Sequence, residues 1–209
     1  MQSAQTHQQS VRHATALLLA LLVGGALGGC ATNPDINPAK QLAELKKDRA
    51  KAEALYQRGL KTDSPKKKQK RFEQALELDS RLGPAHHNLG VVLFRQKQYY
   101  EAAQHLERAG QLMVDSGVPY ANLAVLHGRV GHWDQALKFA KKALKRQPGH
   151  HLALRTKARA LLETEAEFET IQQTLKQIAV KDPSKRWRQW ATARAKAKRD
   201  AQPPWERES

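Results

Sequence analysis

The 209-residue sequence contains a single cysteine, Cys30, so no disulfide can form within the chain. Aromatic residues make up only 6% of the sequence, which is little for the core of a large β-sheet. Nowhere do β-branched residues alternate with polar ones over the length of a strand. These absences exclude a disulfide-stapled domain and an extensive sheet. Because Ala, Leu, Lys, Gln and Glu dominate instead, we expect an all-α fold.

Long hydrophobic runs are scarce as well. The one extended apolar run, residues 14–27, is about 14 residues long, too short to cross a bilayer of about 30 Å as a helix. It has the length of the apolar region of a secretory signal, and Arg12 precedes it. The run leads into Leu27-Gly28-Gly29-Cys30, which resembles the bacterial lipobox. The alternative is an ordinary secretory signal in which the cysteine is incidental.

The lipobox resemblance implies a lipoprotein whose signal peptide, residues 1–29, is removed and whose Cys30 carries covalent lipid. Ala31 follows, where an aspartate would retain an enterobacterial lipoprotein in the inner membrane. The resemblance therefore implies the outer membrane, on its periplasmic face. We expect residues 30–46 to form the lipidated end and a tether, because prolines and asparagines interrupt its first half.

Acidic residues are outnumbered by basic ones, 20 against 36, which gives a net charge of +16. A charge of this size suggests a nucleic acid, an acidic protein or an anionic lipid surface as partner. The export signal argues against nucleic acid. We therefore predict an envelope protein or peptide with acidic groups, with membrane contact through the lipid anchor. A solvated basic surface without a partner is the alternative.

Motifs of catalytic and metal sites are also missing. Nine histidines are present, but none forms the H-E-x-x-H helix motif, and a lone cysteine cannot build a thiolate zinc site. The sequence has no glycine-rich phosphate loop and no G-x-S-x-G elbow. We predict no catalytic residue, no metal site and no cofactor besides the lipid on Cys30.

The sequence does have an internal repeat. Like residues recur 34 positions apart, among them Leu89 and Leu123, Ala102 and Ala136, and the series Ala75, Ala109 and Ala143. A fixed period of this length indicates a solenoid of helical hairpins, and 34 residues is the period of the tetratricopeptide repeat (TPR). The resemblance also includes Leu89-Gly90, an aromatic residue at Tyr99 and again at Trp133, and Pro148.

The resemblance implies an all-α, TPR-like α-solenoid of about three to four helix hairpins plus a C-terminal helix. The repeats should span residues 47–183, in units at about 47–82, 83–116 and 117–150 and a degenerate unit at 151–183. The lysine run at 66–70 should replace the turn of the first unit. Residues 184–209 should form a basic helix and tail. Its tryptophans either pack on the last repeat or contact anionic headgroups.

The first helix of each unit should line a ligand groove. With the register fixed by Leu89 and Leu123, Asn88 and Asn122 occupy equivalent positions. In the family, asparagines at this position bind the backbone of an extended peptide and groove arginines hold carboxylates. Alternatively, these asparagines are structural. The predicted groove comprises His87, Asn88, Val91, Phe94, Arg95, Asn122, Val125, Arg129, Arg155 and Arg159.

A lipid-anchored repeat protein of this design resembles the pilotins and the Flp-type (tight adherence) pilus assembly lipoproteins. The resemblance implies a non-enzymatic scaffold or adaptor in the cell envelope, acting in the assembly of pilus or secretion machinery. Other hypotheses are an adaptor for an envelope peptidase or cell-wall hydrolase, a basic protein that binds an anionic lipid surface, and, least favoured by the motifs, an enzyme.

Overall fold

The computed structural model describes residues 37–196, and within them it contains nine helices and no strand. The chain divides into two units, residues 1–41 and 42–209, and the architecture below is that of the second. No described helix is both long enough and apolar enough to span a membrane. The helices are α2 (Pro38–Lys61), α3 (Pro65–Leu78), α4 (Gly83–Arg95), α5 (Tyr99–Leu112), α6 (Val118–Arg129), α7 (Trp133–Arg146), α8 (His151–Glu163), α9 (Phe168–Lys181) and α10 (Lys185–Lys196).

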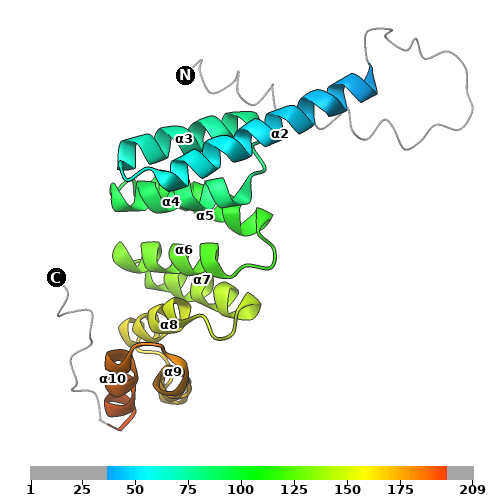
Figure 1. Ribbon diagram of the computed structural model, residues 1–209. Helices are drawn as coiled ribbons and strands as arrows, with labels where there is room; N and C mark the ends of the chain where they lie inside the picture. The colour runs from blue at the N-terminus through cyan, green and yellow to red at the C-terminus, as the bar shows by residue number, and fades with distance from the viewer. Residues whose placement is uncertain (1–36, 197–209) are drawn as a thin grey trace, which may run out of the picture. The chain divides into compact units, whose positions relative to one another are not determined.

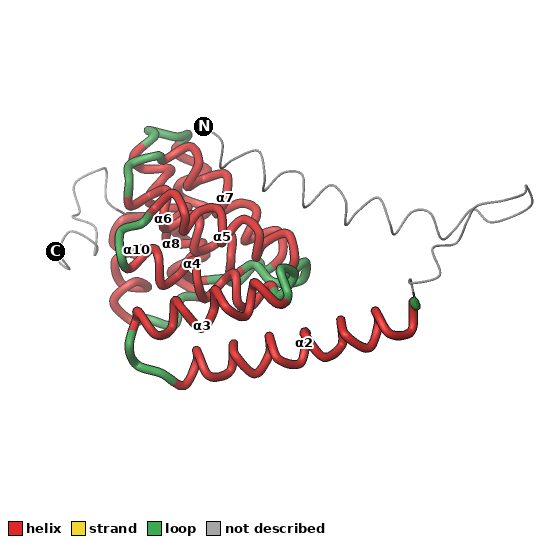
Figure 2. Tube along the Cα trace, turned by 90° about the horizontal axis from the view of Figure 1, so that it is seen from above, coloured by secondary structure: helices red, strands yellow, loops and turns green. Residues whose placement is uncertain are grey.

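Consecutive helices form hairpins, α4 with α5, α6 with α7 and α8 with α9, and these hairpins stack along the chain (Figure 1). The first helices contact one another in succession, α4 with α6 and α6 with α8. Short loops join each helix to the next (Figure 2). Helix α10 packs on α9 after the last hairpin. The expected all-α solenoid of helix hairpins with a C-terminal helix is confirmed.

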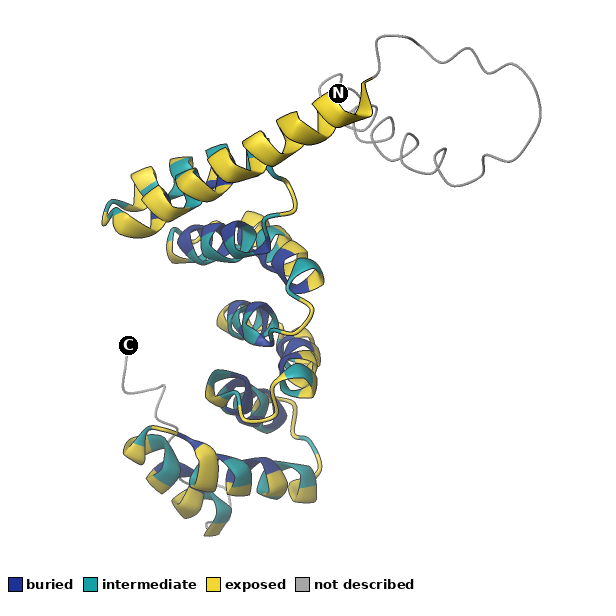
Figure 3. Cartoon of the chain, turned by 45° about the vertical axis from the view of Figure 1, so that its right-hand side comes forward, coloured by how far each residue is buried: buried dark blue, intermediate teal, exposed yellow. Residues whose placement is uncertain are grey.

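Alanines let the helices approach each other closely. Ala102, Ala109, Ala136 and Ala143 are all 0% exposed, which confirms that the repeated small residues lie at helix contacts. Larger apolar side chains fill the space between hairpins, including Phe72, Leu89, Leu106, Leu123 and Leu154. Burial is concentrated on the inner faces of the stacked helices, whereas α2 is exposed along most of its length (Figure 3).

The turn inside each hairpin uses one residue with a left-handed backbone. These residues are Lys97 (φ 64°), Gly131 (φ 78°) and Glu165 (φ 49°), spaced 34 positions apart. The next N–H in each case reaches back to the first helix, to a carbonyl 3.0, 2.9 and 3.0 Å away on Leu93, His127 and Leu161. This bond satisfies a carbonyl at the helix end and requires the left-handed residue. Of the three residues, only Gly131 adopts that backbone without steric penalty.

We expect Gly131→Ala to lower the free energy of unfolding by about 1 kcal/mol, because a Cβ disfavours the left-handed backbone. Gly149→Ala is the matched control: at both glycines the space that a Cβ would occupy is open, but φ of Gly149 is outside the left-handed region. That variant should be neutral or slightly stabilising. Chemical denaturation of both variants measures the difference, and equal effects would contradict the role assigned to this turn.

Two local expectations are corrected, one about the tether and one about the first unit. Helix α2 begins at Pro38, so the part of the predicted tether at residues 38–46 is helical. Asn37 starts the helix, because its Oδ1 accepts hydrogen bonds from the N–H groups of Ala39 and Lys40 at 3.0 and 3.2 Å. The lysine run 66–70 lies inside α3 and not in a turn, because Ser64 caps that helix and Pro65 opens it.

The C-terminal helix packs on the last repeat. Trp190 is 8% exposed and belongs to an apolar cluster with Leu154, Leu175 and Ile178. Trp187 packs against the same cluster and meets Trp190 edge to face, with 5.4 Å between ring centres. The tryptophans therefore cover the end of the solenoid core, which is the first of the two roles considered for them. The predicted signal peptide, Cys30 and residues 197–209 lie outside the described residues.

Candidate functional site

The ten predicted groove residues lie on three consecutive first helices, α4, α6 and α8. Each of them is half-buried or exposed. We call this set the first-helix surface. It comprises His87, Asn88, Val91, Phe94 and Arg95 on α4, Asn122, Val125 and Arg129 on α6, and Arg155 and Arg159 on α8.

Both asparagines of the first-helix surface bond to the preceding first helix. Asn88 Nδ2 donates to the Tyr56 hydroxyl of α2 at 3.0 Å, and Asn122 Nδ2 lies 2.7 Å from Nε2 of His87. Burial lowers the pKa of His87, although a hydrogen bond to Asn88 opposes this, so the neutral ring can accept the Asn122 proton. The amide donors of these asparagines therefore link successive repeats.

Arg155 was expected to hold a ligand carboxylate, but it pairs with a carboxylate of the protein itself. Its Nε and Nη2 donate to the two carboxylate oxygens of Asp182 at 2.8 and 2.6 Å, and the Asp182 side chain is 0% exposed. The guanidinium also lies over the Trp187 ring at 4.7 Å. Arg155 thus joins α8 to the segment that leads into α10. The bidentate geometry expected for a ligand is used within the fold.

The acid that pairs with Arg155 is held ionised. Burial alone would raise the pKa of Asp182, but hydrogen bonds from the Arg155 side chain and the Ser184 N–H outweigh it. The positive charge of Arg155 acts in the same direction, so the net effect lowers this pKa. Arg188 Nη1 donates to the backbone carbonyls of Asp182 and Pro183 at 2.7 and 3.0 Å. The start of α10 is therefore fixed by charged hydrogen bonds.

The remaining arginines of the first-helix surface fall into two kinds. Arg159 lies over the Trp133 ring at 4.7 Å, and its Nε is 3.7 Å from a Glu163 carboxylate oxygen. An acid thus stands beside this part of the surface, although the predicted groove residues include none. Arg95 and Arg129 are exposed in the last turns of α4 and α6, and they have no ion pair among the described residues. These two arginines are the exposed cations of the first-helix surface.

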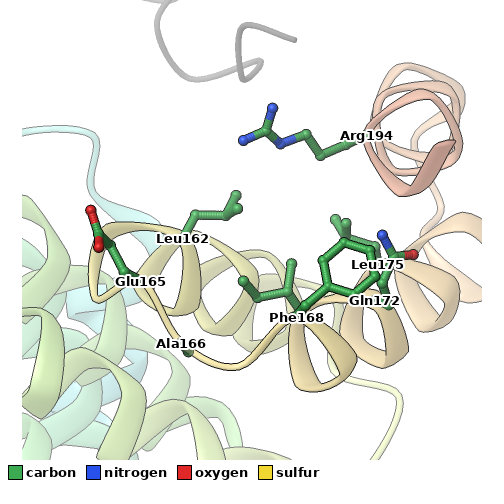
Figure 4. Close-up of a pocket in the computed structure, with 8 residues that line it drawn as sticks. Leu162, Glu165, Ala166, Phe168, Gln172, Leu175 and Arg194 are labelled. Carbon is green, nitrogen blue, oxygen red and sulfur yellow. The ribbon is translucent and has the colours of Figure 1, made fainter. Parts of the chain in front are cut away.

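A pocket of about 320 Å³ lies elsewhere, between the end of α8, the start of α9 and the end of α10 (Figure 4). The repeat pattern does not predict this pocket, because its walls come from three helices whose packing that pattern does not specify. Phe168 opens α9 as Tyr99 and Trp133 open α5 and α7, and only the structure shows that Phe168 is 66% exposed. The pocket is lined by Leu162, Glu165, Ala166, Phe168, Ile171, Gln172, Leu175 and Arg194.

The histidines do not form a metal site in the described part of the chain, where no group of three or more His, Cys, Asp or Glu residues is placed to hold an ion. Instead, His86 and His105 pair across the α4–α5 hairpin, with 2.9 Å between their Nδ1 atoms. His86 Nε2 lies 3.1 Å from the Ser80 carbonyl and can donate to it. Burial lowers the pKa of both rings, and one proton between the Nδ1 atoms requires that at least one of the two rings be neutral.

We expect the protein to lose stability as the pH falls below about 6.5. Burial lowers the pKa values of His86, His105 and His127 in the folded state, so the unfolded chain binds more protons. Stability is therefore fully present above the unfolded histidine value and declines below it. Thermal midpoints measured at pH 8, 7, 6 and 5 should fall by several degrees in total. His105→Gln, compared with the parent at each pH, should fall less; an identical slope would contradict the assignment to this pair.

The comparisons with known proteins agree with this geometry. Residues 81–149 match the family model described as tetratricopeptide repeat. No curated protein sequence matches the chain. The solved structure of MamA is 21% identical with a TM-score of 0.56, over 66% of this chain and 83% of that one. YrrB, described as a TPR protein with an unusual peptide-binding site, is 17% identical with a TM-score of 0.56, over 76% and 82%.

Pseudomonas aeruginosa pilF is 21% identical with a TM-score of 0.57, over 74% of this chain and 68% of that one. At such low identity these structures show the fold alone. The fold is one that commonly serves as a protein-interaction scaffold. The described chain is therefore a TPR-like α-solenoid, and its residues 81–149 match the tetratricopeptide repeat model.

Proposed function

We propose that this protein is a non-enzymatic scaffold of the bacterial cell envelope, anchored by lipid on Cys30 to the periplasmic face of the outer membrane. It binds an acidic segment of another envelope protein on the first-helix surface. The observation that carries the proposal is the pair of exposed arginines, Arg95 and Arg129, at equivalent positions of two adjacent first helices.

The chemistry around these arginines suits an extended acidic peptide. A guanidinium binds a carboxylate through two parallel hydrogen bonds, and the half-buried Val91, Phe94 and Val125 provide apolar contacts on the same helices. Binding energy in interfaces comes from such combinations of apolar anchors and arginine. A net charge of +16 attracts an acidic partner over distance.

Two resemblances support a role in pilus or secretion machinery. The structural neighbours include Pseudomonas aeruginosa pilF, and another neighbour, YrrB, has a peptide-binding site. The lipobox before a repeat domain is also the design of the pilotins and the tight adherence pilus lipoproteins. A scaffold on the inner leaflet of the outer membrane would hold its partner close to that membrane.

The binding surface is tested by in-cell crosslinking of the full-length protein. Arg95→Glu combined with Arg129→Glu should reduce crosslinks to the native partner by about tenfold or more, because each reversal places a carboxylate against an acidic ligand. The control is Lys66→Glu with Lys67→Glu, two exposed reversals of equal charge on α3. Arg155 is left intact, because its loss would damage the fold. Equal yields from both double variants would refute the surface.

The lipid anchor is tested separately. Cys30→Ser should move the protein from the outer-membrane fraction to the soluble periplasm and abolish labelling with radioactive palmitate, since serine offers no thiol for the diacylglyceryl group. A Cys30→Ser protein that still sediments with the outer membrane would refute the lipid anchor and would leave the binding surface untouched.

One observation favours a second candidate, binding to an anionic lipid surface. Helix α7 exposes Lys138, Lys141, Lys142 and Lys145 along one face, at positions that share a side of a helix. Burial lowers the pKa of Lys157 on the next helix, and the positive charge of Lys141 lowers it further. Cosedimentation with phosphatidylglycerol vesicles that is lost on reversing these four lysines would favour this function over a protein partner.

A further inference from the structure

The last hairpin lacks a contact that closes the hairpin before it. In the earlier hairpin, Trp133 opens α7 and the guanidinium of Arg159 from α8 lies 4.7 Å above its ring. Phe168 opens α9, and Arg194 lies on α10, the helix that follows. Each comes 35 positions after its counterpart, one position beyond the 34-residue period. The pair Arg194 and Phe168 therefore lies near, but not at, the repeat-equivalent positions of Arg159 and Trp133.

In the last hairpin this arginine and this aromatic ring are separated by the pocket of about 320 Å³ (Figure 4). Arg194 extends over the pocket from α10, and Phe168 stands on the α9 side. Phe168 is 66% exposed, which leaves a large apolar side chain in contact with water. The pocket thus lies between an arginine and an aromatic ring that do not touch, whereas Arg159 and Trp133 of the preceding hairpin do.

The guanidinium of Arg194 has a nitrogen that lacks a hydrogen-bond partner among the described residues at this pocket. Its Nη1 is buried and has no hydrogen-bond partner in the described part of the chain. A buried donor of a charged group without a partner is destabilising, and an anion in the pocket would satisfy it. The one acid that lines the pocket, Glu165, lies at the opposite end, beyond Leu162 (Figure 4). The arginine end is therefore where a carboxylate would bind.

We propose that this pocket binds a peptide segment of a partner protein in which a large apolar side chain adjoins an aspartate or glutamate. The apolar side chain fills the space between Phe168 and Arg194, over Leu162 and Leu175, and the carboxylate pairs with the Arg194 guanidinium. This contact is separate from the first-helix surface and does not depend on it.

The size and surroundings of the pocket favour a peptide over a long acyl chain. Its volume is at the low end of the range of about 300–1,000 Å³ for ligand sites, which suits one large side chain. A second hollow of about 430 Å³ shares Phe168 and Gln172 with the pocket and is lined by both Glu169 and Lys176 of α9. A peptide that continues along this hollow would meet charges of both signs there, so a glutamate on each side of the apolar residue lets one carboxylate reach Arg194 in either peptide direction.

The experiment measures binding of a fluorescein-labelled peptide, Ser-Glu-Phe-Glu-Ser, to the full-length protein in mild detergent by fluorescence anisotropy. The comparison peptide is Ser-Gln-Phe-Gln-Ser, which keeps the shape and removes the charges. We expect the glutamate peptide to bind about tenfold more tightly than the glutamine peptide. Arg194→Met should abolish this preference, and Lys185→Met, an exposed cation on the same helix, should keep it.

Stability separates ligand binding from a structural role of Arg194. Because Nη1 has no partner, Arg194→Met should leave the thermal midpoint unchanged or raise it. Equal affinity for the two peptides, or retention of the preference in Arg194→Met, would overturn the proposal. Binding that is seen only after Trp205→Ala would also overturn it, by assigning the pocket to the chain's own residues that follow Lys196.

Discussion

Replacing Asp182 by alanine should lower the free energy of unfolding by about 3–5 kcal/mol, the range for breaking a buried ion pair at one partner. The change removes the carboxylate that accepts hydrogen bonds from Nε and Nη2 of Arg155. It also removes the acceptor of the Ser184 N–H. In a chain of this size the thermal midpoint should fall by roughly 10 °C. The loss should be largest at neutral pH, because the folded state lowers the pKa of Asp182. The ionised carboxylate therefore stabilises the fold at pH values above the pKa of an aspartate in the unfolded chain, and this stability is lost as the pH falls through the pKa in the folded protein.

A double-mutant cycle tests whether the pair is the cause. Arg155→Met should be about as destabilising as Asp182→Ala, and the double variant should lose much less than the two losses added together. Arg129→Met is the control, because this exposed arginine has no ion pair among the described residues; it should change stability by less than about 1 kcal/mol. Additive losses in the cycle would show that Arg155 and Asp182 do not act as a pair.

Replacing Arg146 by methionine should lower the free energy of unfolding by about 2–3 kcal/mol, the upper range for hydrogen bonds to a charged group. The Nη1 atom of Arg146 on α7 donates to the carbonyls of Gly110, Met113 and Ser116, at 2.8, 3.2 and 3.2 Å. These carbonyls belong to the end of α5 and the loop after it, in the preceding repeat. The guanidinium also lies over the Tyr120 ring at 4.5 Å. The Arg146 side chain therefore donates to carbonyls that would otherwise be unpaired at the end of the preceding repeat.

Three variants separate the parts of this interaction in denaturant unfolding. Arg146→Lys keeps the charge but loses the planar guanidinium, so it should recover only part of the stability. Lys145→Met removes a neighbouring exposed cation of α7 and should be close to neutral. If Arg146→Met unfolded at the same denaturant concentration as Lys145→Met, the carbonyl contacts would not contribute to stability.

The fold could be predicted from the sequence because its determinants are local. Helix faces follow from residue spacing, and a 34-residue period places the same small residue at the same helix contact in each hairpin. Ala102 and Ala136 are fully buried for this reason. The positions of the first helices follow from the same period, so the ten predicted groove residues lie on α4, α6 and α8 as expected.

What the groove residues contact could not be predicted in this way. Arg155 occupies the same repeat position as His87 and was predicted to bind a ligand. Its guanidinium instead forms an ion pair with Asp182, 27 residues later in the sequence. Likewise, the carbonyls that Arg146 binds lie 30 to 36 residues before it. Such partners are chosen by how adjacent hairpins pack, and a repeat period carries no information about residues that differ from one repeat to the next.

The sequence is enough to predict a helical solenoid and the helices that face one another. The packed structure shows in addition that Arg155 is structural, that Arg95 and Arg129 are exposed, and that Arg194 and Phe168 lie on opposite sides of a pocket. The physical reason is that backbone periodicity is set by neighbours a few residues away, whereas charge pairing and cavities depend on distances between helices.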